Sequence, residues 1–255
     1  VTETARDAGL AATPLPVDEQ GLVVDSLAAH PDVGAVAVAP AHQYPSGAVM
    51  SPRRRAALVE WARQRGALVV EDDYDAEYRY DRDPIGSLQG LAPDLVVYAG
   101  SASKSLAPGT RLGWLAVPRD LVAPLADLQR RRGGMPGSLH QLALADLVQR
   151  GELDRHLRRQ RRHYRRRRDA LLAELARQLP QLSVHGAAAG LFVVLRLPGE
   201  LDEAEVLAAA RAAGVALEGV GAEHPALVIG YANLAESEVG RAVGALAGSI
   251  RSAAA

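Results

Sequence analysis

The segment of residues 100–114 brings together residue types that bind phosphate and that react with carbonyl groups. It contains the hydroxyls of Ser101 and Ser103, the amine of Lys104, a Pro-Gly turn and Arg111. Hydroxyls and a guanidinium that converge on one point suit a phosphate, because the guanidinium fork matches two phosphate oxygens. Cationic neighbours and loss of solvent both disfavour the charged form of a lysine there, which leaves a nucleophilic amine. The segment is typical of a phosphate site beside a reactive lysine, although similar serine-rich turns also occur in loops that bind nothing.

A cluster of acids follows a predicted apolar strand in residues 69–75. Side chains two residues apart share a face of an extended chain, so Asp72 and Tyr74 are expected to point together and Asp73 away from them. Ligands of open α/β sheets bind beyond the carboxyl ends of the strands, where a carboxylate and a phenol can bind a pyridine nitrogen and a ring oxygen. Pyridoxal phosphate combines such a ring with a phosphate and an aldehyde that a lysine holds. The two segments together therefore predict a pyridoxal phosphate site, whereas Asp73 and Asp75 are expected to form a solvated turn.

The elements that position these segments alternate between strands and helices. Ser51 followed by Pro52 predicts the start of a helix, which is expected to end at Gly66. This alternation predicts an α/β fold with a mostly parallel sheet covered on both faces. Apolar runs predict the strands of this part of the chain near residues 13–17, 33–39, 67–72, 95–99 and 112–117.

The pattern changes from residue 138 onward. Leucines such as Leu139 and Leu142 recur at helical spacing, and a long helix is expected to follow as far as Leu179. Further strands are predicted at residues 191–197 and 226–231, with a helix that starts at Asp202 and another at the C-terminus. The predicted organisation is a partial large domain, connecting helices and a small C-terminal α+β domain, which occupy residues 1–137, 138–180 and 181–255.

Composition and charge exclude few functions but set the context. The 255 residues have a formal net charge of −1 and no cysteine, so disulfides and thiolate chemistry are excluded and the whole surface has no electrostatic preference for nucleic acid. No apolar run reaches the length of a membrane span, and a cytoplasmic location is expected. Residues 158–168 include eight arginines. They go around the expected helix rather than along one face, so a solvated linker helix is favoured over a DNA-binding surface.

Several segments closely resemble pyridoxal phosphate enzymes of fold type I. They are AHQYPSG, VVEDDYDAEY and GSASKSLAPGTRLGW, and the likeness is greatest to the aminotransferase-like domain of MocR/GabR-type regulators of the GntR family. It continues through HYRRRRDAL and PALVIGYANL, so that it covers nearly the whole chain. The resemblance implies a fold-type I transferase-like α/β architecture and a homodimer.

The resemblance also implies a role for each site residue. Lys104 would hold the cofactor as a Schiff base, Asp72 would pair with the pyridine nitrogen, and Tyr74 would bond the ring hydroxyl. The phosphate would be bound by Ser101, Ser103 and Arg111. Tyr44 stands where related aminotransferases carry an asparagine that contacts the ring oxygen, with His42 and Gln43 nearby.

Two departures from the family pattern bear on the ligand. The segment of residues 219–225 lacks the arginine that usually binds a substrate carboxylate in the resembling domains; His224 could contribute, but Glu223 beside it would oppose an anion. The N-terminal winged helix-turn-helix of the regulators is expected to be missing, together with the first part of the aminotransferase-like domain, which supplies a ring-stacking aromatic residue and part of the phosphate loop.

Three functions remain open on this basis. The first is an effector-sensing domain, in which an amine or amino acid forms an external aldimine with pyridoxal phosphate and the resulting change alters DNA binding elsewhere in the protein. The second is an aminotransferase for an amino acid and a 2-oxo acid, with Lys104 as general base. The third is a fold that binds no cofactor. The segments EDDYD and HQYPSG favour the first function, the effector-sensing domain.

Overall fold

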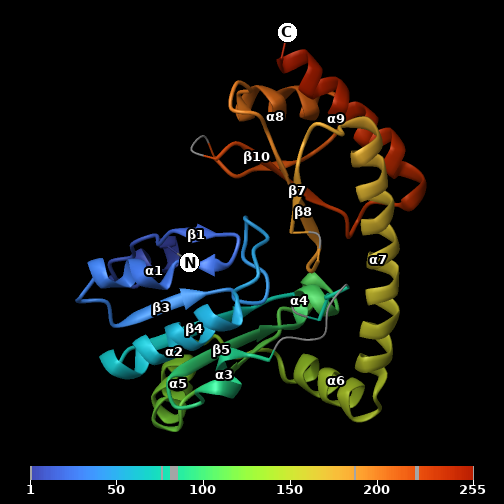
Figure 1. Ribbon diagram of the computed structural model, residues 1–255. Coiled ribbons are helices and arrows are strands. Elements are labelled where there is room, and N and C mark those ends of the chain that lie inside the picture. The colour runs from blue at the N-terminus through green and yellow to red at the C-terminus, as the bar shows by residue number, and fades with distance from the viewer. Residues whose placement is uncertain (1, 76, 81–85, 187, 222–223, 255) are drawn as a thin grey trace. The chain divides into compact units, whose positions relative to one another are not determined.

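The chain consists of two compact units (Figure 1), which are described in turn. The computed structural model describes residues 2–75, 77–80, 86–186, 188–221 and 224–254. The first unit contains residues 2–43, 48–75 and 86–151, and the second contains the remaining described residues. The predicted domain boundaries at residues 137 and 180 stay predictions.

A four-stranded sheet forms the centre of the first unit. Its first three strands are parallel, and the fourth is antiparallel to the third. Only residues 102–112 separate the last two strands, which is less than the dozen or more residues that a parallel crossover needs. The mostly parallel sheet predicted from the sequence is therefore confirmed, with one antiparallel edge strand. In spatial order the strands are β3 (Ala35–Val38), β4 (Leu68–Asp73), β5 (Val96–Ser101) and β6 (Gly113–Ala116).

Helix α2 (Pro52–Arg65) begins and ends where the sequence predicts. The Ser51 side chain accepts a hydrogen bond from the N–H of Arg54, and Gly66 closes the helix in the left-handed conformation with φ 62°. These are the usual devices for satisfying the free N–H and C=O groups at helix ends. The buried core of this unit gathers apolar side chains from the helix, the sheet and the N-terminal segment, among them Leu27, Met50, Leu58, Val69, Leu88 and Val96.

The N-terminal segment contains less strand than expected. The strand predicted near residues 13–17 starts only at Val17, because Pro14 and Pro16 have no N–H to donate to a ladder. The elements before β3 are α1 (Thr2–Asp7), β1 (Val17–Asp18), β2 (Gly21–Leu22) and the 3₁₀ helix η1 (Val24–Ala29).

Two further helices of the first unit expose apolar side chains. They are α5 (Arg119–Arg131), which the sequence analysis did not predict, and α6 (Ser138–Gln149), and neither contains a buried residue. Leu139 is 82% exposed and Leu142 is 66% exposed. The leucine periodicity correctly predicts a helix here, and the structure shows that these leucines are exposed rather than buried.

The second unit is built on a four-stranded antiparallel sheet. Successive residues of its central strands alternate between two apolar clusters: Val193 and Leu195 pack in the larger core, whereas Phe192 and Val194 belong to a smaller one. This alternation follows from the two-residue period of a strand. In spatial order the strands are β7 (Val184–His185), β8 (Phe192–Arg196), β10 (Ala226–Gly230) and β9 (Glu218–Gly219).

Three helices also contribute to the larger core: α7 (Glu152–Gln178), α8 (Glu203–Ala212) and α9 (Val239–Ala253) (Figure 1). The predicted start of α8 is confirmed, because the Asp202 side chain accepts hydrogen bonds from the N–H groups of Ala204 and Glu205. Among the described residues, no helix combines the length and the apolar character that crossing a membrane requires.

Candidate functional site

The predicted lysine loop is a short, pinned connection between β5 and β6. Ser101 ends β5, and the chain then forms the single-turn helix α4 (Ala102–Ser105) and the 3₁₀ turn η2 (Pro108–Thr110). The ladder pairs Ser101 with Gly113, and the N–H of Ala102 donates to the carbonyl of Leu112 over 2.9 Å. Because both ends of the loop are fixed in the sheet, Lys104 and Arg111 are held on one connection of the first unit.

The serines at the start of the loop have a defined arrangement. The Oγ of Ser101 accepts a hydrogen bond from the N–H of Ser103 at 3.1 Å and so caps α4. A hydroxyl that accepts in this way retains its own proton for donation. Ser101 can therefore donate to an anionic oxygen without giving up its structural role, which suits the phosphate contact that the sequence predicts.

Arg111 has an unusual backbone conformation. Its φ of 48° and ψ of 31° are left-handed, and it is the one non-glycine residue with positive φ in the part of the chain that the structure describes. Such a conformation costs on the order of 1–3 kcal/mol and is characteristic of ligand-binding positions. The exposed guanidinium is thus presented by a strained residue that glycine would replace at lower conformational cost.

Lys104 is exposed rather than desolvated. A reactive amine was expected here from loss of solvent, but the described residues around the loop do not shield this side chain from solvent. The loop instead leaves the amine accessible from solvent.

Gly100 is required by a contact that the sequence analysis missed. It pairs with Trp114 across β5 and β6, and a Cβ at residue 100 would overlap the indole of Trp114. The indole therefore lies directly over the strand that leads into the lysine loop. A glycine before the Ser-x-Ser-Lys segment and a tryptophan after it are the sequence signal of this packing.

Asp72 lies at the end of β4, and Tyr74 follows directly after this strand. The register pairs Asp72 with Ala99 and Asp73 with Gly100, so Asp72 is two ladder positions from the residue that starts the loop, Ser101. Asp72 remains open to solvent, yet the surrounding protein removes part of its hydration, and this together with Asp73 and Asp75 raises its pKa. The structure thus brings Asp72 next to the strand end that carries the lysine.

The Tyr74 hydroxyl already has a partner. It donates a hydrogen bond of 2.8 Å to the carbonyl oxygen of His42. A phenol has one proton, so it cannot donate to a ring oxygen at the same time and would have to exchange this bond or accept from the ring hydroxyl. The predicted contact of Tyr74 with the cofactor stays a prediction.

The remaining acids of the cluster do not form the solvated turn that was predicted. Asp75 is buried, and its Oδ2 lies 2.8 Å from the Nδ1 of buried His42. Asp73 accepts a hydrogen bond of 2.8 Å from the hydroxyl of Tyr98 on β5. The prediction is wrong because it considered only local sequence, whereas each acid has a partner at least 25 residues away.

Glu71 is a further buried acid with a structural role. Its side chain is 2% exposed and accepts hydrogen bonds from the N–H groups of Leu88 and Gln89, at the start of α3 (Leu88–Leu91). Burial raises the pKa of Glu71, and the two N–H donors oppose that rise. Glu71 therefore joins β4 to the segment that leads into β5.

Tyr44, predicted to contact the cofactor, belongs to the second unit. There its hydroxyl donates to the carboxylate of Glu218, and its ring meets that of Phe192 edge-on, with centroids 5.4 Å apart. Loss of solvent, and then the hydrogen bond to Glu218, raise the pKa of Tyr44 to about 12. Tyr44 and the lysine loop thus belong to different units, and its cofactor role stays a prediction.

The segment expected to lack a carboxylate-binding arginine is organised by an acid. The Glu203 carboxylate accepts hydrogen bonds from the N–H groups of Val220, Gly221 and Ala226, at distances between 2.9 and 3.2 Å. The predicted effect of Glu223 lies outside the described residues. Glu203 had no recognisable signal in the sequence, because its partners are 17 to 23 positions away.

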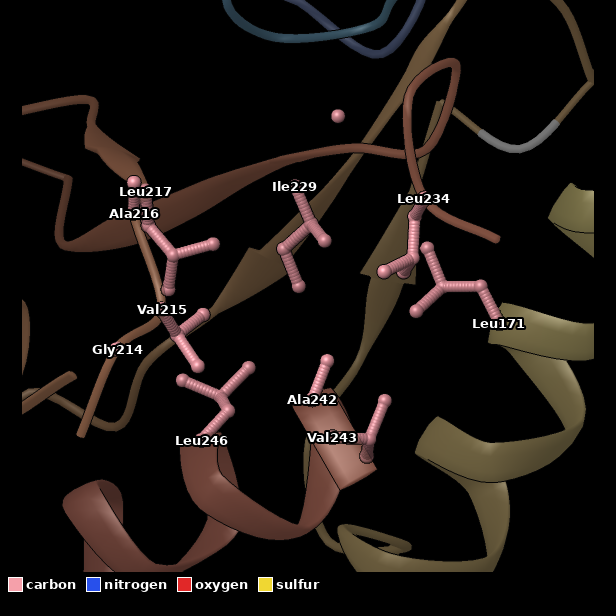
Figure 2. A pocket seen from close by; sticks show the side chains of 11 residues that line it. Leu171, Gly214, Val215, Ala216, Leu217, Ile229, Leu234, Ala242, Val243 and Leu246 are labelled. Atoms are coloured by element: carbon pink, nitrogen blue, oxygen red, sulfur yellow. The ribbon is translucent and has the colours of Figure 1, made fainter. Parts of the chain in front are cut away.

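A pocket of about 190 Å³ lies within the second unit (Figure 2). Its side chains come from α7, α9, β10 and the segments after α8 and β10, and Figure 2 shows Val215, Ile229 and Leu246 pointing into it. The lining is apolar, and none of the seven predicted site residues is among the described residues that form it. The pocket is therefore distinct from the predicted cofactor site.

Comparisons of this chain with known proteins agree on one family. Residues 23–246 match the family described as aminotransferase class I and II. The chain is 35% identical over 235 residues to the uncharacterized HTH-type transcriptional regulator YhdI of Bacillus subtilis, with 89% of this chain and 50% of that protein covered. It is 39% identical over 181 residues to the HTH-type pyridoxine biosynthesis transcriptional regulator PdxR of Corynebacterium glutamicum, covering 71% and 39% of the two chains. The chain thus spans about half the length, or less, of these curated relatives.

Solved structures agree with this result. The multiple substrate aminotransferase of Thermococcus profundus superposes with a TM-score of 0.88 at 27% identity, covering 96% of this chain and 65% of that one. The α-aminoadipate aminotransferase LysN of Thermus thermophilus, solved with N-(5'-phosphopyridoxyl)-L-leucine, gives a TM-score of 0.88 at 26% identity and covers 96% and 67%. The α/β fold-type I architecture expected from the sequence is therefore confirmed, and the chain belongs to the aminotransferase class I and II family.

Proposed function

We propose that this chain is the pyridoxal phosphate-binding, effector-sensing domain of a MocR-type transcriptional regulator, and that its effector is an amine or an amino acid. The observation that carries the proposal is the pinned loop, which carries Lys104 and the strained Arg111 and starts two ladder positions from Asp72. The curated relatives support the regulatory part, because YhdI and PdxR are named HTH-type transcriptional regulators.

The donor set of the first unit fits the cofactor. Ser101 has a hydroxyl proton free to donate, and Arg111 adds a guanidinium on the same loop, which together match a phosphate. Asp72 supplies a carboxylate for a protonated ring nitrogen, and Lys104 supplies the amine for the aldehyde. When bound, the cofactor supplies an electrophilic carbon that exchanges one amine for another.

The residues of this chain have separate tasks in such a site. Arg111 and Ser101 would bind the phosphate and so fix the position of the ring. Asp72, whose pKa is raised by lost hydration and neighbouring acids, holds a proton on the ring nitrogen in place once the two groups are paired. Lys104, whose side chain is exposed, would hold the aldehyde carbon of the cofactor through its amine.

A working aminotransferase is the second candidate, since the solved relatives include aminotransferases at 26–27% identity. Turnover needs a group that holds the substrate carboxylate, and residues 219–225 contain no arginine for it. Release of a 2-oxo acid from any common amino acid would favour this candidate over the sensing domain.

We further propose that the chain works as a homodimer. The apolar side chains exposed on α5 and α6, which include Leu128, Leu139 and Leu142, support a covered face in the working assembly.

The proposed cofactor site can be tested without any activity. Lys104 is the only lysine in the 255 residues, so an adduct with pyridoxal phosphate can form only there or at the terminal amine. The chain should develop a visible absorption band with the cofactor, and borohydride reduction followed by mass spectrometry should place the added mass on Lys104. Lys104→Ala should abolish both signals, and an unchanged band in that variant would overturn the assignment.

A variant of Arg111 tests the phosphate contact in a titration of the chain with pyridoxal phosphate. Arg111→Gly removes the guanidinium but accepts the left-handed backbone, so the loop should keep its shape while the cofactor binds at least tenfold more weakly. Arg53→Gly, at an exposed arginine of α2, is a control for removal of a guanidinium elsewhere. Equal cofactor affinity of the wild type and Arg111→Gly would contradict the phosphate contact.

A further inference from the structure

The arginines of α7 divide into two sets when their environments are compared. One set faces the core of the second unit: the Nε of Arg161 donates to the carbonyl of Glu77 at 2.8 Å, and Arg167 donates to the carbonyl of Ala232. Arg168 is buried, with its guanidinium 4.8 Å from the centre of the Tyr80 ring. These arginines stabilise the unit itself.

The second set forms a single stripe along the opposite face of the helix. Its members recur at intervals of three and four residues, which places them on one face of an α-helix. All are exposed, and at a rise of about 1.5 Å per residue they extend over roughly 17 Å. The eight arginines of residues 158–168 therefore do go around the helix, as expected, but the exposed ones among them lie along one face. The stripe consists of Arg155, Arg158, Arg159, Arg162, Arg165 and Arg166.

Acidic partners are found only toward the ends of this stripe. Arg155 pairs with Glu152 at 2.6 Å, and Arg166 pairs with Glu236 at 3.3 Å. None of the three central residues, Arg158, Arg159 and Arg162, forms an ion pair with a described residue; Arg159 only approaches His156, at 3.5 Å.

Like charges three and four residues apart on a helix destabilise it. The centre of the stripe is therefore a surface that the fold does not neutralise, and its positive charge lowers the stability of the helix.

We infer that this arginine stripe binds the phosphate backbone of double-stranded DNA, as a second contact in addition to that of a helix-turn-helix domain. Over roughly 17 Å one DNA strand carries about five phosphates, which matches the row of guanidinium forks. The stripe presents no large apolar side chain, so it lacks the means to insert into a lipid surface. The choice of DNA among polyanions rests on the proposed regulatory function.

The experiment compares two variants of equal net charge. The first replaces the stripe centre, in Arg158→Gln/Arg159→Gln/Arg162→Gln. The control replaces three exposed arginines on other surfaces, in Arg53→Gln/Arg65→Gln/Arg251→Gln. Binding of the whole chain to a fluorescein-labelled duplex of about 25 base pairs, long enough to span the stripe, is followed by anisotropy over a range of salt concentrations.

The stripe variant should bind at least tenfold more weakly at low salt. Its slope of log K against log salt should be smaller by about 2.7, because each lost phosphate contact removes about 0.9. The control variant should keep the slope of the wild type. Equal losses in both variants, absence of salt-dependent binding by the wild type, or equal competition by polyglutamate at the same charge would each overturn the inference.

The proposals for the cofactor site and for the arginine stripe can be tested independently of each other. The stripe variant should keep the absorption band that depends on Lys104, and Lys104→Ala should keep the duplex affinity. If the wild-type chain shows no band with the cofactor but binds the duplex as expected, the proposed function is contradicted and the inference about the stripe stands. If it shows the band but the stripe variant binds the duplex like the wild type, only the inference about the stripe is contradicted.

Discussion

Two residues of the candidate site are arranged at a cost to the fold. Arg111 adopts a backbone conformation that favours glycine, and the charged form of Asp72 is disfavoured by lost hydration and then by Asp73 and Asp75. Neither feature stabilises the chain by itself. Local conflicts of this kind are expected where a site is shaped for a ligand rather than for stability.

We therefore predict that the charge of Asp72 lowers the folding stability of the chain but strengthens the binding of pyridoxal phosphate. Because its pKa is raised in the folded chain, folding favours the protonated carboxyl, and stability is lost as pH rises from the ordinary aspartate value of about 4 through the raised value. Asp72→Asn should raise the melting temperature at about pH 7, and the difference should vanish near about pH 3, below both pKa values. The same variant should bind pyridoxal phosphate more weakly, because a neutral amide does not favour a protonated ring nitrogen.

Thermal unfolding at the two pH values and a cofactor titration test this pair of effects. Asp94→Asn, at an exposed aspartate of the same unit, is the matched control. A melting temperature that is lowered at neutral pH would contradict the unfavourable environment inferred for Asp72.

At the scale of elements, buried or half-buried acids join segments that are distant in sequence. Glu71 connects β4 to α3, and Glu203 in the first turn of α8 holds the backbone around β9 and the start of β10. A carboxylate can accept several N–H donors at once, which makes it an efficient anchor for backbone at the end of a short strand or helix.

Glu203→Gln should lower the free energy of unfolding by about 1–2 kcal/mol, because one of the two accepting oxygens becomes an NH₂ group and the bonds that remain lose their charge assistance. Amide exchange should increase at Val220, Gly221 and Ala226. Chemical unfolding and hydrogen exchange measure the two effects. Glu205→Gln, two residues away on the same helix, should stay within about 0.5 kcal/mol of the wild type. Equal losses in both variants would show that helix charge, and not the loop, is responsible.

Local signals account for the part of the structure that was predicted from the sequence. Ser51 and Asp202 mark helix starts, and the valine-rich runs mark β3, β4 and β5, because capping and strand periodicity act over a few residues. The pairing of Asp75 with His42 and the anchor at Glu203 depend on chain segments that only folding brings together. The arginine stripe needed the orientation of α7, which decides which of many arginines face solvent.

At the scale of the whole molecule, the first unit leaves an apolar surface on helices that contain no buried residue. Trp114 and Leu115 on β6 add to the exposed apolar side chains of α5 and α6. Large exposed apolar surfaces are uncommon on monomeric proteins and mark sites of association.

Leu139→Glu/Leu142→Glu should convert the proposed homodimer to a monomer, because each substitution places a charge where the partner would remove solvent. Sedimentation equilibrium measures the change. Leu91→Glu, at a leucine that is 61% exposed outside these helices, should leave the assembly as it is. A wild-type chain that is monomeric at high concentration, or dissociation by both variants, would contradict an interface at α6.

The contact between Gly100 and Trp114 gives this chain an optical reporter at its most informative position. The sequence contains two tryptophans, and the other, Trp61, lies on α2. In a Trp61→Phe background the remaining emission comes from an indole that packs on the strand leading into Lys104. Quenching of that emission, or a change in its wavelength, would follow the lysine loop itself as ligands arrive, in real time and without an attached dye.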